Sequence, residues 1–275
     1  GRCAMPLLRY GQCGSTRGAA DLGVDRVSLP NPANRVSSRA IPLEEAVQTS
    51  IGKGHAEAFA AHPGENGLHL LRSGRDAFVA RAVLAQRAER SIDLQYYIFS
   101  QDTVGSLLIR QLLRAADRGV RVRMLIDDLY GNKGEDVWVA LDAHPGVDVR
   151  LFNPWIRGRS RALQYVRRRG ELNHRMHSKS YTVDNQIAIL GGRNIADAFF
   201  EADPDTAFTD RDMVLMGPAV QEVEAAFDEY WNSSHAVPVA ELVRTGTDGD
   251  LQKLRTRLEV AHRSDRSRGY IEALR

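Results

Sequence analysis

The residues of this chain that could do chemistry gather in one short stretch. His177, Lys179 and Asp184 stand at H-x-K-x4-D spacing, and Gly191-Gly192-Arg193-Asn194 follows after an apolar run. Period-2 alternation places the imidazole of His177 and the ammonium of Lys179 on one face of a predicted strand. Such a pair suits a tetrahedral phosphate, because the ammonium can hold its oxygens while a neutral imidazole nitrogen attacks phosphorus.

The flanking residues fit the same chemistry. Asp184 is the third expected catalytic residue beside His177 and Lys179; it comes just past the strand, where its carboxylate could fix backbone or a neighbouring basic group. Gly192 lets a substrate approach the backbone closely, and Asn194 can donate an amide N–H to a phosphate oxygen. A lone H-x-K is usually only a polar strand face. This chain, however, has four lysines among its 37 basic residues, which makes a chance meeting of these residue types rare.

The pattern H-x-K-x4-D-x6-G-[SG]-x-N, complete from His177 to Asn194, resembles the HKD motif of the phospholipase D superfamily. Residues 91–99 and 172–179 resemble the amino-terminal half of bacterial cardiolipin synthases of that superfamily. The resemblance covers about residues 66–235. It implies phosphodiester exchange through a covalent phosphohistidine. The other histidines match no metal-ligand spacing, so neither a metal nor a cofactor is predicted.

The resemblance also implies a role for each matched residue. His177 would be the nucleophile, and Lys179 and Asn194 would neutralise the negative charge that develops on the phosphate. The family places a carboxylate that orients the nucleophile in an S/T-D-x-D segment, which Thr209-Asp210-Arg211-Asp212 matches. Asp210 is therefore the expected acceptor for the other ring nitrogen of His177, and Asp212 is the reserve.

Four further residues are candidates around this site. Gln95 lies on the first predicted strand of the resemblance, where the family has a polar residue near the substrate. His174 is expected to support the site from outside. Asp127 and Asp128 end another predicted strand, where they could face a cleft or only cap a helix.

Strands and helices alternate through the middle of the chain. Period-2 and β-branched runs predict strands, and periodic apolar positions predict helices between them. The predicted strands cover 91–99, 120–126, 147–152, the HKD stretch, 187–190 and 212–216; helices are predicted at 51–61, from Gly74, after Asp102 or Thr103, at 135–143 and from Pro218. This order predicts an α/β fold with a mixed, largely parallel β-sheet sandwiched between helices, a phospholipase D-like α/β/α lobe.

The composition suggests three parts. Residues 1–50 mix Gly, Ser, Pro, Asn and Arg without apolar periodicity and are expected to form a flexible leader. Residues 51–239 form the catalytic lobe with one HKD motif. Residues 240–275 are expected to be a linker or helix toward a missing second lobe, because Leu251, Leu254 and Leu258 make an apolar stripe with no obvious partner.

Charge and hydropathy bear on where the chain acts. Its net charge is only +2, but arginines gather in residues 157–175 among Leu163, Tyr165 and Val166. This stretch is either a solvated, charged loop or a surface for lipid head groups or nucleic-acid phosphates. The two cysteines, Cys3 and Cys13, suggest neither a disulfide scaffold nor a metal site. With no transmembrane segment expected, the resemblance implies a peripheral or anchored protein of the bacterial cell membrane.

Only one H-x-K occurs, whereas the superfamily site takes two. The expected partner is a second HKD lobe, from a missing C-terminal half or a homodimer. The leading hypothesis is a cardiolipin synthase-like phosphatidyltransferase that acts on anionic phospholipid at the membrane surface. One alternative is a single-HKD phosphodiesterase or nuclease that is active as a homodimer on nucleic acid. The other is a non-catalytic phosphate- or lipid-binding lobe.

Overall fold

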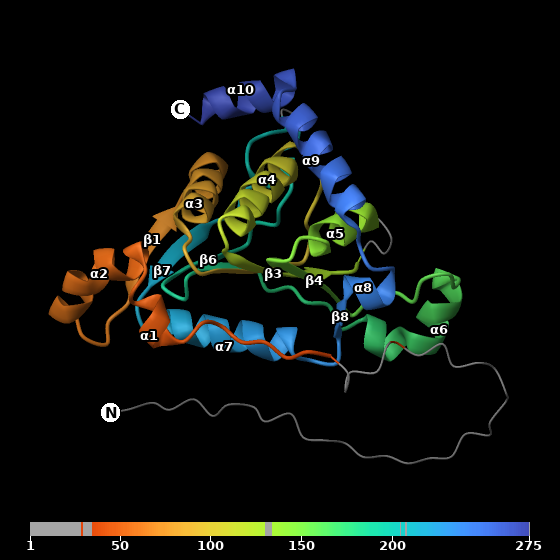
Figure 1. Ribbon diagram of the computed structural model, residues 1–275, viewed down its shortest axis with the longest axis horizontal. Coiled ribbons are helices and arrows are strands. Elements are labelled where there is room, and N and C mark those ends of the chain that lie inside the picture. The colour runs from red at the N-terminus through yellow and green to blue at the C-terminus, as the bar shows by residue number, and fades with distance from the viewer. Residues whose placement is uncertain (1–28, 30–34, 130–133, 204, 207, 275) are drawn as a thin grey trace, which may run out of the picture.

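A single mixed sheet organises the described part of the chain. The structure is a computed structural model that describes residues 29, 35–129, 134–203, 205–206 and 208–274. Eight strands of these residues follow the order β1-β7-β6-β5-β2-β3-β4-β8 (Figure 1). They are β1 (Gly67–Leu71), β2 (Ser91–Tyr96), β3 (Arg121–Asp127), β4 (Val147–Phe152), β5 (Ser180–Val183), β6 (Ile187–Gly191), β7 (Asp212–Met216) and β8 (Ala236–Pro238).

The sheet is mixed, as expected, but it is less parallel than the sequence suggested. Only the pairings of β2 with β3 and of β3 with β4 are parallel, whereas the other five pairings are antiparallel. Parallel neighbours need a crossover helix, and α4 (Thr103–Asp117) and α5 (Glu135–Asp142) supply the two that exist. The HKD region instead continues from β5 through a hairpin to β6 and then to β7, and both of these neighbouring pairs are antiparallel.

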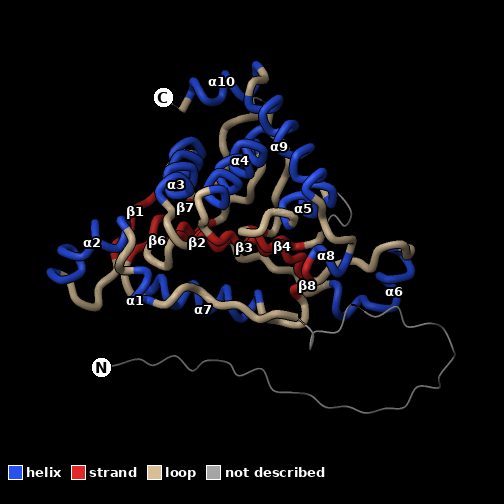
Figure 2. Tube along the Cα trace, in the orientation of Figure 1, coloured by secondary structure: helices blue, strands red, loops and turns tan. Residues whose placement is uncertain are grey.

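Helices cover both faces of the sheet, which confirms the expected α/β sandwich (Figures 1 and 2). On one face lie α3 (Gly74–Arg87), α4, α5, α9 (Asp248–His262) and α10 (Asp265–Ala273), and α7 (Ala219–Trp231) runs along the other. The shorter or peripheral elements are α1 (Leu43–Ala46), α2 (Ser50–Ala61), α6 (Arg161–Leu172), α8 (Val239–Leu242) and the 3-10 turn η2 (Asp197–Phe199).

Local sequence explains why α4 begins and ends where it does. The Asp102 side chain accepts a hydrogen bond from the backbone N–H of Gly105, which caps the first turn. Leu108 and Leu112, one helical turn apart, are fully buried against the sheet. Gly119 follows with a φ of +92°, a left-handed conformation that stops the helix before β3.

The chain before α2 packs onto the lobe from residue 35 onward. The guanidinium of Arg123, buried under α7, donates to the carbonyl oxygen of Ser38 at 3.1 Å, and Arg150 donates to that of Val36. The backbone N–H of Ala40 donates to Asp228 of α7 at 2.9 Å. Residues 35–50 thus pack on the lobe instead of forming part of the flexible leader expected over residues 1–50, and several of their backbone polar groups bond to it. Residues 1–28 and 30–34 lie outside the described residues.

The carboxyl-terminal helices also belong to this lobe. Leu254 and Leu258 of α9 are 4% and 5% exposed, because α9 packs against α4 and α5. Ion pairs flank this contact, with 2.7 Å between Arg110 and Glu259. The expectation that this apolar stripe of α9 is exposed until a second lobe covers it is therefore wrong for Leu254 and Leu258. The sequence missed the partner because it lies on helices more than a hundred residues earlier.

Candidate functional site

His177 and Lys179 lie on the segment that leads into β5, not on the strand itself. The strand begins at Ser180, directly after Lys179. The imidazole of His177 is exposed and Lys179 is half-buried. The Nζ of Lys179 donates a hydrogen bond of 2.7 Å to the backbone oxygen of His177. The ammonium is thus held beside the residue that carries the imidazole.

Tyr97 joins this pair, and the sequence pattern did not single it out. The centroids of the Tyr97 ring and the His177 imidazole lie 4.2 Å apart at an angle of 32°. The Nζ of Lys179 lies 5.8 Å from the same phenol ring. Contact between an aromatic face and the imidazole limits how the imidazole can rotate, and it leaves the ring edge with its nitrogens open. The aromatic run after β2 was the only sequence signal for this contact.

Asn194 ties its own loop to the segment that carries Tyr97. Its side-chain oxygen accepts a hydrogen bond of 3.0 Å from the backbone N–H of Ile98. The next residue, Ile195, bonds through its backbone to Ile98 and Ser100. The amide oxygen of Asn194 is therefore used by the fold, while the N–H groups of the same amide are the donors suited to a phosphate oxygen.

The two glycines of the motif make room for protein, not for substrate. A Cβ on Gly192 would lie 2.3 Å from an oxygen of Asp210, and one on Gly191 would lie 2.0 Å from an oxygen of Asp212. The small residues therefore let the segment 210–212 pass against the motif. The expectation that Gly192 contacts substrate has no support in this geometry.

Asp210 and Asp212 have different environments. The Asp212 carboxylate is fully buried, with 2.8 Å to the guanidinium of Arg81 and 3.8 Å to that of Arg193. This carboxylate is occupied by structural ion pairs, so it is a poor reserve acceptor for His177. Asp210 is half-buried, and its negative charge acts on Lys179. Burial lowers the pKa of the Lys179 ammonium, and the charge of Asp210 opposes that shift.

Asp184 lies at the other end of β5 from His177 and Lys179. Its side-chain oxygens accept backbone N–H groups from Glu89, Arg90 and Ser91, at 2.7 Å from Arg90 and 2.9 Å from Ser91. The residue has a φ of +52°, in the turn between β5 and β6. Burial raises the pKa of the Asp184 carboxyl, and the three N–H donors oppose that shift. The carboxylate thus fixes the HKD hairpin to the start of β2, and the expected direct part in the reaction is not supported.

The segment before His177 is anchored at the ends of β3 and β4. Asp127 accepts hydrogen bonds from the backbone N–H of Met176 at 2.9 Å and from the Arg175 guanidinium at 3.1 Å. The side chain of Asn153 donates to the backbone oxygen of His174 at 2.8 Å. Burial raises the pKa of the Asp127 carboxyl to about 6. The exposed His174 thus lies on the anchored stretch that leads to His177.

Gln95 is buried within the sheet. It lies on β2 opposite Ser180 of β5, at 5% exposure, and alternation puts it on the α7 face with Asp93. Within the described residues, its side-chain oxygen and the Ser180 hydroxyl have no hydrogen-bond partner. Gln95 neighbours the HKD strand, but no contact joins it to His177 or Lys179 in the part of the chain that the structure describes.

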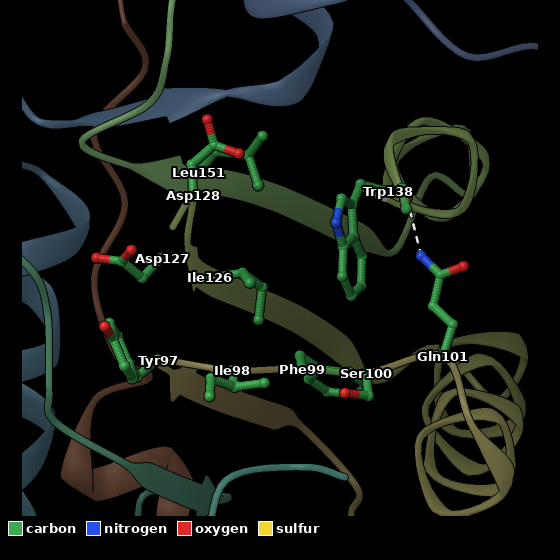
Figure 3. A pocket seen from close by; sticks show the side chains of 11 residues that line it. Tyr97, Ile98, Phe99, Ser100, Gln101, Ile126, Asp127, Asp128, Trp138 and Leu151 are labelled. Carbon is green, nitrogen blue, oxygen red and sulfur yellow. Dashed lines mark hydrogen bonds between the residues drawn. The ribbon is translucent and has the colours of Figure 1, made fainter. Parts of the chain in front are cut away.

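A cavity of about 490 Å³ opens beside Tyr97, at the carboxyl ends of β2 to β4 (Figure 3). Tyr97 and Asp127 lie at one end and Trp138 at the other. Ile126, Phe99 and Leu151 also line it, together with Asp128. The wall thus mixes apolar side chains with the polar Ser100 and Gln101, and carboxylates lie at one end. The negative charge of these carboxylates makes that end unsuited to a second phosphate.

The described residues contain neither a cluster of metal ligands nor a membrane-spanning helix. In that part of the chain, no three His, Cys, Asp or Glu side chains are placed to hold a metal ion together. Within the same residues, no helix combines the length and the apolar composition needed to cross a bilayer.

Comparison with known proteins was made by sequence and by fold. Residues 83–231, more than half of the chain, match the family model described as "Cardiolipin synthase, PLD-like domain". Cardiolipin synthase C of Escherichia coli K12 is 44% identical over 182 residues, which is 66% of this chain and 38% of that protein. The cardiolipin synthase of Oceanobacillus iheyensis is 28% identical over 170 residues, 62% of this chain and 34% of that protein. The chain spans less than two fifths of the length of either relative.

A solved structure supports the fold alone. The phosphatidylserine synthase of Haemophilus influenzae superposes with a TM-score of 0.50 at 14% identity, over 72% of this chain and 44% of that chain. At this identity the likeness concerns only the arrangement of sheet and helices.

Proposed function

Because the chain belongs to the phospholipase D-like domain family of cardiolipin synthases, we propose that it supplies the nucleophilic half of a phosphatidyltransferase site. The observation that carries the proposal is the meeting of His177, Lys179 and Tyr97 with the Asn194 loop. These groups come from the ends of different strands, so the fold itself brings them together. An exposed imidazole beside a fixed ammonium is the arrangement that attack on a phosphodiester needs.

In the proposed first step, a ring nitrogen of His177 attacks phosphorus. The new N–P bond forms as the P–O bond to the leaving alcohol breaks, and that alcohol oxygen takes up a proton. An acceptor alcohol then gives its proton to a base and attacks the phosphohistidine, which restores the imidazole. The ammonium of Lys179 and the N–H donors of Asn194 offset the negative charge on the phosphate oxygens in both steps.

Three carboxylates orient or position the proposed nucleophile, His177. Asp210 is the proposed acceptor for the second ring nitrogen of His177, because it lies close enough to influence Lys179 and is not taken up by a buried ion pair as Asp212 is. Asp184 and Asp127 act at a distance, by holding the two ends of the segment around the nucleophile.

The proposed substrate is an anionic phospholipid at the bacterial membrane surface, where the chain would act as a peripheral protein. The proton for the leaving alcohol would come from the histidine of a second HKD lobe, in further polypeptide or in a second copy of this chain. The family and the relatives named above support this proposal.

The half-site can be tested with a substrate that needs no general acid. Nitrophenolate leaves without protonation, so a short-chain phosphodiester with nitrophenolate as its leaving group should release about one equivalent of nitrophenolate with this chain in a burst. His177→Ala should abolish both the burst and the acid-labile phosphate adduct seen by mass spectrometry. His174→Ala is the matched control, because His174 is exposed only three residues earlier, and it should keep both.

Other results would count against the proposal. An adduct that survives in His177→Ala would mean that another residue is the nucleophile. A chain that binds the substrate but gives no burst would favour a non-catalytic lobe. A burst that rises with the square of protein concentration would favour a site assembled from two copies.

A further inference from the structure

Helix α6 buries the polar side chain of Gln164 and exposes several apolar side chains, although its last residue, Leu172, is buried. Gln164 is 6% exposed, and its amide bonds both the N–H and the carbonyl oxygen of Ile156, at 2.8 and 2.9 Å. Its neighbours Leu163, Tyr165 and Val166 are 46%, 47% and 78% exposed. A helix that merely covers a protein core shows the opposite arrangement. The outer side of α6 therefore suits an apolar environment outside this lobe.

Arginines flank this apolar surface. Arg159 and Arg167 are exposed, and Arg161 lies with its guanidinium 5.7 Å from the ring of Trp155. Other arginines of the same stretch turn inward, since Arg157 pairs with Asp128 and Arg175 with Asp127. The basic stretch seen in the sequence thus separates into arginines that hold the fold and arginines that face outward beside Leu163 and Val166.

The helix is also coupled to the nucleophile. It ends at Leu172, and the short segment from there to His177 is fixed by the bonds of Asn153 to His174 and of Asp127 to Met176. Figure 1 shows α6 projecting at one edge of the molecule, apart from the helices that cover the sheet. A surface that α6 contacts would consequently lie at a fixed position relative to His177.

We propose that α6 lies in the head-group region of an anionic lipid bilayer. Leu163 and Val166 would enter the apolar boundary, while Arg159 and Arg167 would contact lipid phosphates. A nucleic acid would satisfy the arginines but would leave the exposed Leu163 and Val166 without an apolar partner. The apolar centre with a basic border therefore favours lipid over nucleic acid.

Vesicle binding of the full chain tests this inference. Binding to phosphatidylglycerol-rich vesicles should weaken about tenfold in Leu163→Gln/Val166→Gln, because two apolar side chains no longer enter the bilayer. Arg159→Gln/Arg167→Gln should weaken it about ten- to thirtyfold at low salt and leave a remainder that salt hardly affects. Neither pair touches the proposed reacting groups, so the nitrophenol burst should be unchanged.

The matched controls lie on other elements, at the end of α3 and on or just after α9. Val260→Gln replaces an apolar residue of α9 that is 68% exposed, and Arg87→Gln/Arg263→Gln removes two exposed charges elsewhere. Both controls should bind vesicles within twofold of the original chain. Equal losses of vesicle affinity in the controls and the α6 variants would overturn the inference, since net charge or nonspecific hydrophobic adsorption would then explain binding.

Two other outcomes would assign α6 to another partner. If duplex DNA competes with vesicles, and only the arginine variant loses affinity, the surface is for nucleic acid. If the chain sediments as an oligomer, and Leu163→Gln/Val166→Gln makes it monomeric, the apolar side is a protein contact. Loss of the burst in His177→Ala with vesicle binding intact would leave this inference standing, because binding does not depend on turnover.

Discussion

At the scale of single residues, the carboxylates of the motif region divide between the fold and the reacting groups. Asp184 and Asp212 are fully enclosed, the first by backbone N–H donors and the second by arginines. Only Asp210 lies near Lys179 without such a structural commitment. The aspartate of the motif therefore bonds to backbone at the start of β2, and β5 separates it from His177 and Lys179.

Asp184 gives the first prediction at this scale. Asp184→Ala should destabilise the chain by about 3–5 kcal/mol, because three backbone N–H groups near Ser91 lose a charged acceptor and alanine disfavours a positive φ. Asp184→Asn keeps one acceptor oxygen and tolerates this φ, so it should cost about 1–2 kcal/mol. Urea unfolding monitored by circular dichroism measures both.

The nitrophenol burst separates structure from chemistry in the same variants. Per folded molecule, the burst of Asp184→Asn should stay within a few-fold of the original chain. A variant with full stability and no burst would mean that the Asp184 carboxylate takes a direct part in the reaction.

How much of the site could be predicted depends on where each contact lies along the chain. His177, Lys179 and Asn194 are recognisable because they stand within one short motif. Tyr97 was missed, because it is eighty residues from His177 in sequence and only the pairing of the strands brings the two rings into contact. The tie of Asp184 to backbone was foreseen as one option for a carboxylate in a turn, but its partners at Glu89 to Ser91 follow only from the pairing of β2 with β5.

At the scale of elements, the segment between α6 and β5 is held at the ends of two strands. Asp127, the last residue of β3, bonds to Met176 and Arg175, and burial raises the pKa of its carboxyl to about 6. A carboxyl whose pKa is higher in the folded state binds its proton more tightly there. Its contribution to stability is thus full below about pH 4 and is lost as the pH rises through about 6.

This linkage gives a prediction at the element scale. Asp127→Asn cannot titrate, so the free energy of unfolding of the original chain relative to this variant should fall by about 2–3 kcal/mol between about pH 4 and pH 7. Urea unfolding at intervals across that range would measure the difference. A difference that stays constant with pH would contradict the burial of Asp127 between β3 and the segment before His177.

The elements that sequence predicted well are those with a local signal. The Asp102 cap, the apolar face of α4 and the start of α7 after Pro218 all follow from neighbouring residues. Strand β1 was missed, because Leu68 and Leu70 are exposed on an edge strand and show no buried alternation. Helix α6 was not predicted as a helix, and residues 157–175 were left open between a charged loop and a surface for phosphates, since most of its apolar residues do not face this lobe.

At the scale of the whole molecule, one body includes both flanks of the central lobe. Residues 35–40 lie along α7, bound by Arg123, Arg150 and Asp228, and α9 covers α4 and α5 on the opposite face. The partition expected from composition was wrong at both boundaries for the same reason. Composition reports how apolar a segment is, but it does not show which surface of the rest of the chain the segment packs against.

Truncating the α9 contact tests this view. Leu258→Ala should lower the free energy of unfolding by about 2–4 kcal/mol, because it opens a cavity between α9 and the helices beneath it. Val260→Ala, on the exposed side of the same helix, should change it by less than about 1 kcal/mol. If both substitutions changed the free energy of unfolding equally and only slightly, in thermal and in urea unfolding, α9 would be a linker helix that does not pack on the lobe.

The place of β1 in the sheet affects how the protein acquires its structure during synthesis. This strand emerges early, yet its only ladder partner is β7, and the nearest paired residues, Leu71 and Asp212, are 141 positions apart. The parallel centre from β2 to β4 can pair over shorter separations, so it is expected to fold first. Until β7 follows, Leu68 and Leu70 belong to an unpaired strand that other chains can bind. Because Asp210, the proposed acceptor, lies just before β7, the proposed half-site would be among the last parts of this lobe to form.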